Sequence, residues 1–353
     1  MDLKGNIRWF FQGSTTGAQR ARKTARLLIV LALFAGLFWL VPIDQVLHAM
    51  LSADPHFFAL GTALALVSLS LTSVQIEPLT RNQGIKHSIG SILAINLAMR
   101  FYLQFTPSTI IASGFRWYRL AQPGGKNVEA LVALGFFRVM ETFITLAMGV
   151  AFWLLSGRQS SLEISVVWLV LIILAIILSW LVVTRYSLSI YRWLENHSGG
   201  FLHKDPWNAI NRRIVKVLNA VCAYANMPAL DLLLAITAGV LSALVGIASG
   251  VILARAVGID LGFLTMGWIQ AVILIATQLP FTVAGGLGIR EVTLVAILAT
   301  LGIGADLALA LSFLLFIRGV LLSLLGGVLE AIDAIRGRRS SPAHPAPGDF
   351  KEL

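Results

Sequence analysis

The sequence has little of what soluble enzymes use. Of its 353 residues, 12% are charged and one is a cysteine. The single Cys222 excludes a disulfide or a Cys-x-x-Cys metal site within the chain, and the six histidines do not recur at metal-ligand spacing. No glycine-rich phosphate loop of the Walker type occurs. We therefore expect no metal, no cofactor and no catalytic residues. Any transport by this chain would need a driving force other than nucleotide hydrolysis.

Apolar residues fill the space that charge leaves. They make up 57% of the chain, and the mean hydropathy is +0.83. Two apolar regions, 89–120 and 262–303, are interrupted by proline and glycine, whereas six others are continuous: 27–41, 57–76, 128–155, 164–183, 231–254 and 307–332. Runs of this kind predict an all-α polytopic membrane protein. We expect about six full spans plus two re-entrant helical hairpins, or eight spans if the hairpins cross fully.

Basic residues predict the orientation. With the hairpins returning to their own side, 21 of the 27 Lys and Arg fall on one side of the membrane, in segments 1–26, 77–88, 114–127, 184–230 and 333–353. Positive loops face the cytoplasm, so we expect both termini there, in a bacterial inner membrane. The organisation is then a basic segment at 1–26, a transmembrane domain at 27–335 and a disordered cytoplasmic tail at 336–353. We interpret 1–26 as a cytoplasmic anchor before the first helix. A signal peptide is disfavoured, because the small-residue cleavage site is missing and further spans follow.

The two interrupted regions are alike. Residues 107–116 and 280–290 both run from a proline through hydroxyl and small residues to Gly-apolar-Arg. Proline and glycine break helices, and lipid cannot satisfy the freed backbone groups, so such breaks line polar cavities or lie in protein. Paired breaks point to a transporter's substrate site. The topology makes units 57–155 and 231–332 an inverted repeat.

Arginines within the apolar runs are the candidate substrate-binding residues. An arginine at a helix centre costs roughly 2.5–3.5 kcal/mol on insertion scales, so it needs a partner or a function. Arg138 and Glu141 are spaced to pair on one helical face, whereas Arg318 needs a partner from elsewhere. With the glycines that permit close backbone approach, the predicted anion site comprises Arg116, Arg138, Glu141, Pro280, Gly285, Gly286, Gly288, Arg290, Glu291 and Arg318.

Structural roles compete with this interpretation. Each arginine could instead cap a broken helix or pair with an acid. For Arg100 we favour such a role, snorkelling or pairing with Glu77, and Asn96 beside it is expected to pack the first hairpin against a span. Segment 206–224 carries an apolar stripe beside basic residues; it is expected to lie on the cytoplasmic leaflet, with packing on neighbouring loops as the alternative.

These motifs carry a resemblance to a known family. Residues 105–108 through Gly114-Phe-Arg116, then Phe137-Arg138, and above all Leu279 through Glu291, resemble the lysylphosphatidylglycerol synthase transmembrane region, or flippase-like domain. The resemblance covers about 25–335. It implies a helical bundle with paired re-entrant segments that moves lipids between leaflets. The aminoacyltransferase domain of the bifunctional members is not expected here.

The resulting hypothesis is a flippase for a phosphate-bearing lipid, either a phospholipid or a polyprenyl-phosphate-linked one, and not an enzyme. Two alternatives remain open. One is a non-transporting membrane partner of a lipid- or glycan-biosynthetic enzyme, and such an enzyme is a possible partner of the flippase as well. The other is a membrane glycosyltransferase, which would need an acid pair near the outer face, where the loops offer only scattered acids such as Asp44 and Asp54. A nucleic-acid partner is not expected, because the positive charge sits at membrane edges.

Overall fold

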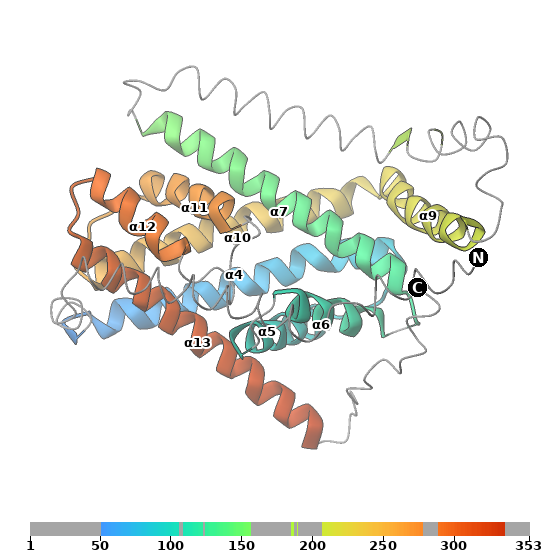
Figure 1. Ribbon diagram of the computed structural model, residues 1–353, viewed down its shortest axis with the longest axis horizontal. Coiled ribbons are helices and arrows are strands. Elements are labelled where there is room, and N and C mark those ends of the chain that lie inside the picture. The colour runs from blue at the N-terminus through green and yellow to red at the C-terminus, as the bar shows by residue number, and fades with distance from the viewer. Residues whose placement is uncertain are drawn as a thin grey trace, which may run out of the picture.

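The computed structural model describes residues 51–105, 109–122, 124–156, 185–186, 189, 207–277 and 289–335. The regular secondary structure of this part of the chain is all helical, with nine α-helices and one 3-10 turn (Figure 1). Four helices are long and apolar enough to cross a membrane: α4 (Pro55–Asn82), α7 (Asn127–Leu155), α10 (Ala229–Ala256) and α13 (Ala305–Ile335). They confirm four of the six predicted spans. The runs 27–41 and 164–183, the basic segment 1–26 and the tail 336–353 lie outside the described residues.

Local sequence signals set the ends of these helices. Asp54 caps α4, accepting a hydrogen bond on Oδ1 from His56 N at 2.7 Å, and Pro55 occupies the first turn, where its missing N–H costs nothing. The chain leaves α4 through Gly84 and leaves α10 through Gly258, both at positive φ (70° and 77°). These caps place each helix end at a defined level of the bundle.

Helices α4 and α10 form the central antiparallel pair (Figure 1). At one end of the pair, Asp54 N donates to Ala256 O at 2.9 Å; at the other end, Arg81 Nη2 lies 2.5 Å from Asp231 Oδ1. Gly61 allows close approach between them, because Ser249 Oγ donates to its carbonyl oxygen at 2.6 Å. The remaining helices are arranged about this pair.

Two pairs of shorter helices replace the interrupted apolar regions. They are α5 (Ile89–Phe105) with α6 (Thr109–Ala121), and α11 (Phe263–Thr277) with α12 (Ile289–Thr300). The two pairs lie toward opposite ends of the long axis in Figure 1.

Each pair leaves and rejoins the bundle at one end. In the first, Lys126 Nζ after α6 donates to Gly84 O before α5 at 3.1 Å. In the second, Ile259 and Leu261, before α11, share a buried apolar cluster with Leu298, near the end of α12.

The first helix of each pair packs against the last long helix of the other unit. Helix α5 contacts α13, and α11 contacts α7. Glycines permit both approaches: a Cβ on Gly326 would clash with the backbone of Leu97, and one on Gly267 would clash with the ring of Phe152. The units 57–155 and 231–332 are therefore interlocked.

Helix α9 (Trp207–Cys222) and the following 3-10 turn η2 (Ala223–Asn226) pack on the ends of α4 and α7. The ring of Tyr224 stacks on Phe136 with centroids 4.1 Å apart, and its hydroxyl donates to Leu79 O at 3.0 Å. Gln83 Nε2 donates to Ala220 O at 2.8 Å. The C-terminal part of this segment therefore packs on the ends of helices α4 and α7, whereas the alternative expected from the sequence was packing on neighbouring loops.

Candidate functional site

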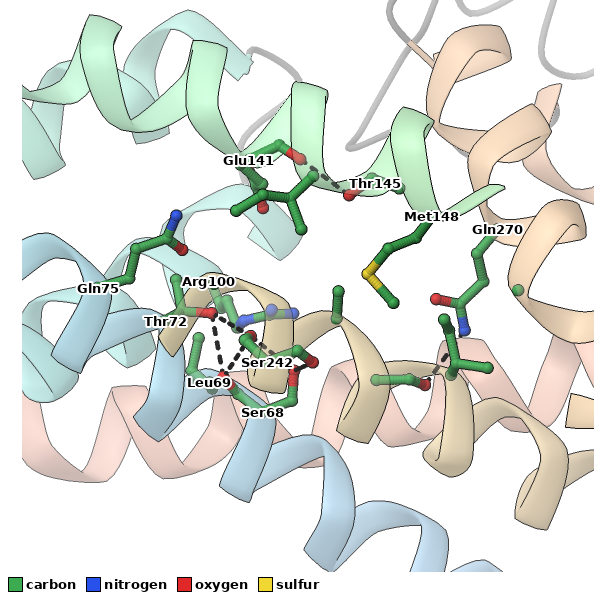
Figure 2. Close-up of a pocket in the computed structure, with 16 residues that line it drawn as sticks. Ser68, Leu69, Thr72, Gln75, Arg100, Glu141, Thr145, Met148, Ser242 and Gln270 are labelled. Atoms are coloured by element: carbon green, nitrogen blue, oxygen red, sulfur yellow. Dashed lines mark hydrogen bonds between the residues drawn. The ribbon is translucent and has the colours of Figure 1, made fainter. Parts of the chain in front are cut away.

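A polar cavity of about 190 Å³ lies beside the middle of the central pair (Figure 2). Helices α4, α5, α7, α10 and α11 all contribute to it, so both units supply its walls. We call it the central cavity; its lining is Ser68, Leu69, Thr72, Gln75, Arg100, Glu141, Ile144, Thr145, Met148, Gly239, Ser242, Ala243, Gly246, Ile247, Gly267 and Gln270. Polar side chains at this depth are costly in lipid, and they face the interior of the bundle.

Hydroxyl groups cover the side of the cavity formed by α4 and α10 (Figure 2). Ser68 Oγ donates to Ser242 O at 2.9 Å, and Ser242 Oγ donates to Ser68 O, also at 2.9 Å. Thr72 Oγ1 lies 2.9 Å from Ser242 Oγ. Ser68, Thr72 and Gln75 recur on one face of their helix, and this spacing was the available sequence signal for a polar wall.

Opposite charges enter the cavity from α5 and α7 (Figure 2). Glu141 accepts a hydrogen bond on Oε2 from Arg138 Nη1 at 2.8 Å, which confirms the expected i, i+3 pair. Arg100 makes no hydrogen bond or ion pair with any described residue. The expectation that Arg100 pairs with Glu77 was wrong, because Glu77 Oε1 accepts from Arg81 at 3.0 Å, one helical turn away.

Amide side chains complete the lining. Gln75 is only 2% exposed, and its Nε2 finds no acceptor among the described residues. Gln270 Nε2 donates to Gly246 O at 3.1 Å, tying α11 to α10. Asn96 Nδ2 donates to Ser73 Oγ at 2.9 Å and ties α5 to α4, as expected. A buried donor without a partner is unfavourable by about 1–3 kcal/mol, so Gln75 favours an acceptor in the cavity.

The other predicted arginines are not among the residues that line this cavity. The Arg116 guanidinium sits over the Phe137 ring, 4.8 Å from its centroid, and its buried Nε and Nη2 lack partners within the described segments. Arg318 Nη1 donates to Ser249 Oγ at 2.9 Å, so its partner comes from another helix, α10. Pro280, Gly285, Gly286 and Gly288 lie outside the described residues.

Arg290 and Glu291 form a fork at the start of α12. Arg290 donates from Nε at 3.1 Å and from Nη2 at 2.6 Å to Glu291 Oε1, and the Glu291 side chain is 7% exposed. Ser312 Oγ of α13 donates to the same oxygen at 3.4 Å. The pair therefore links the second helix pair to α13.

Electrostatic interactions join these residues into one group. Glu141, Arg100 and Arg138 act on the charge of Arg116, and Arg100 and Arg290 act on that of Arg318. Arg100, which the sequence interpretation left outside the site, therefore connects the two sets of predicted residues. The group of five arginines (100, 116, 138, 290 and 318) and two glutamates (141 and 291) has an excess of positive charge. Such a group suits an anion that offers several acceptor oxygens.

Comparison with known proteins places this arrangement in a family. The family model described as lysylphosphatidylglycerol synthase TM region matches residues 25–327, which is most of the chain. No curated protein and no solved structure matches significantly. The match includes all four long helices up to residue 327 of α13, both pairs of shorter helices and every residue of the central cavity. The chain therefore belongs to the family of the lysylphosphatidylglycerol synthase transmembrane region.

Proposed function

We propose that this protein is a lipid translocator that moves a phosphate-bearing lipid between the leaflets of the bacterial inner membrane. The observation that carries the proposal is the group of five arginines and two glutamates, of which Arg100 and Glu141 line the central cavity. Guanidinium groups bind phosphate oxygens with paired, charge-assisted hydrogen bonds. A lipid phosphate held there would cross the apolar layer in a polar environment, while its acyl or prenyl chains stayed in lipid.

The proposal includes an inverted repeat, with the two pairs of shorter helices as re-entrant hairpins. Three kinds of contact support it. Helices α5 and α11 lie toward opposite ends, and each packs on the last long helix of the other unit. The α4–α10 pair is antiparallel. Asn96 and Gln270 tie α5 and α11 to equivalent first helices of their units. Repeats of this kind permit alternating access around a site between them.

The same proposal includes the orientation of the chain in the membrane and the source of energy for lipid movement. The basic segments favour a cytoplasmic position for both termini. The chain performs no group transfer of its own, so movement of lipid is driven by a gradient or by consumption of the lipid on the far side. We propose that a lipid- or glycan-biosynthetic enzyme consumes the translocated lipid. Such an enzyme is therefore a candidate partner.

The test is translocation of fluorescent lipids in proteoliposomes containing the purified full chain. Wild-type protein should move a phosphate-bearing lipid faster than empty vesicles, and Arg138→Ala or Arg290→Ala should lose most of this activity while remaining folded. Arg255→Gln is the control, because Arg255 lies at the end of α10 and pairs with the loop residue Asp260 at 3.8 Å. Wild-type rates in both site variants would remove the site assignment. Absence of movement for every lipid would favour the non-transporting partner.

A further inference from the structure

Among the described residues, two ion pairs join unit 57–155 to unit 231–332. Arg81 Nη2 of α4 lies 2.5 Å from Asp231 Oδ1 of α10, and Arg119 Nη2 of α6 lies 2.8 Å from Glu330 Oε2 of α13. We call these two contacts the gate pairs. Both lie at the end of the bundle that the basic segments favour as cytoplasmic.

A second cavity, of about 130 Å³, surrounds one of the gate pairs. Arg119 and Glu330 both line it, together with His87, which follows the end of α4. His87 Nε2 lies 3.1 Å from Leu120 O, so the chain that leaves α4 runs beside the end of α6. The two gate pairs are therefore at one level of the bundle, and the interface around the second pair is not filled by protein.

Apolar packing between the units is distributed unevenly. The apolar cluster at the end with the gate pairs includes Leu79, and within the described part of the chain it takes Ala235 alone from the second unit. At the opposite end, Phe58 and Phe152 of the first unit pack on a cluster built from α10, α11, α12 and α13. Ion pairs therefore join the ends of the units on one side, and apolar packing joins them on the other.

The Arg81–Asp231 pair lies between the central cavity and this end of the bundle. Gln75 of α4 and Gly239 of α10 are the lining residues nearest to it along the chain. At a rise of about 1.5 Å per residue, the pair is about 9 Å beyond Gln75 and about 12 Å beyond Gly239 along the two helices. Parting of the helices at this end would therefore connect the central cavity with the aqueous phase.

Ion pairs of this kind suit a contact that forms and breaks. The Arg81 side chain is 49% exposed and the other three are 15–22% exposed. Water can therefore replace each partner when the pair separates, and the net stabilisation by such a pair is small. Separation of an apolar contact would instead expose apolar surface to water.

We propose that the gate pairs, Arg81–Asp231 and Arg119–Glu330, form an ionic gate that closes the central cavity toward the cytoplasm in this conformation. When both pairs break, the ends of the two units part about the close α5–α13 contact at Gly326, which lies one turn deeper than Glu330. The cavity then opens to that side. The proposal rests on the translocator function proposed above and supplies one half of its alternating access.

The first test measures access to the cavity apart from transport. In the full chain, Cys222→Ser removes the native thiol and Ala243→Cys places a reporter thiol in the cavity wall. A small, membrane-impermeant methanethiosulfonate reagent is added to the cytoplasmic face of inverted membrane vesicles. Asp231→Asn with Glu330→Gln should raise the labelling rate of the reporter roughly fivefold, because the two contacts that favour the closed state are lost. An unchanged rate would overturn the proposal.

Matched variants separate the gate from a general loss of packing. Asp260→Asn makes the same acid-to-amide change in the Arg255–Asp260 pair, which stays within the second unit at the opposite end, and should leave the labelling rate unchanged. Arg119→Glu with Glu330→Arg restores opposite charges and should label more slowly than Glu330→Gln alone. This comparison also decides the question if the double acid variant does not fold. A rise in Asp260→Asn as well, or a rise only when the reagent meets the opposite face, would overturn the proposal.

Lipid movement then separates this proposal from the function on which it rests. In proteoliposomes, gate variants that label faster should move a fluorescent phosphate-bearing lipid about twofold or more slowly than wild type, because the cavity stays open to one side. A rate that is unchanged or higher would overturn the role of the gate in alternating access. Lipid movement by the wild-type chain with unchanged labelling in the gate variants would leave the translocator in place and remove the gate. Faster labelling in a protein that moves no lipid would do the opposite.

Discussion

Ser68 and Ser242 each donate a hydrogen bond to the backbone carbonyl oxygen of the other, both at 2.9 Å, across the α4–α10 pair. They are 174 residues apart, which is also the separation between Arg116 and Arg290. Reciprocal contact between equivalent residues is what a two-fold axis requires. This serine pair therefore marks where an axis relating the two proposed units would pass, and it does so beside the central cavity.

The reciprocal serine bonds should be coupled energetically. We expect Ser68→Ala and Ser242→Ala each to lower the free energy of unfolding by about 0.6 kcal/mol, a typical value for hydrogen bonds between membrane helices. The double variant should be destabilised by less than the two single effects added together, because both single variants disturb the same contact. Unfolding in mixed micelles measures all three. Ser70→Ala is the control, since Ser70 Oγ donates within its own helix to Leu66 O at 2.9 Å. Strict additivity would contradict the coupling.

Close approach between α5 and α13 depends on Gly326. A Cβ there would meet the backbone of Leu97, which cannot move aside as a flexible side chain can. We expect Gly326→Ala to destabilise the protein by about 1–3 kcal/mol, the usual cost of overpacking. Gly319, in the same helix, has open space where a Cβ would be placed, so Gly319→Ala should be neutral or stabilising. Thermal unfolding in detergent compares the two, and similar effects would argue against the close packing.

The sequence alone predicted the coarse architecture and some of the chemistry. Apolar runs gave four helices that the structure describes, because length and hydropathy are sufficient to identify a span. The spacing of Arg138 and Glu141 gave their ion pair, because residues three apart on a helix share a face. Such inferences need only local geometry.

The central cavity could not be predicted in the same way. Its walls depend on which faces of five helices meet, and this is determined by interhelical packing at positions such as Gly61 and Gly246. Arg100 illustrates the difference. Its nearest acid in the sequence is Glu77, but Glu77 lies within reach of Arg81 on its own helix, and α5 carries Arg100 toward Glu141 instead.

An ion pair joins the first helix pair to the last long helix. Arg119 Nη2 of α6 lies 2.8 Å from Glu330 Oε2 of α13, and the two side chains are 15% and 22% exposed. We expect Glu330→Gln to weaken the docking of α6 on α13 and to lower the unfolding temperature. The charge-reversed pair, Arg119→Glu with Glu330→Arg, should restore part of the loss, and Asp260→Asn, which removes an exposed loop pair, should have little effect. No recovery in the reversed pair would show that the contact stabilises through packing and not through charge.

The Arg116 guanidinium over the Phe137 ring gives the last prediction. Phe137→Leu keeps a buried apolar side chain but removes the aromatic face beneath the cation, an interaction of about 2 kcal/mol or more where it is desolvated. The neighbouring Phe136 stacks on Tyr224 and does not share this role, so Phe136→Leu is a matched control with the same change in size. Both variants should lose similar stability in a thermal unfolding assay. Lipid translocation should fall about tenfold or more in Phe137→Leu alone, because Arg116 then loses the ring that orients it. Equal loss of translocation in the two variants would assign Arg116 a structural role.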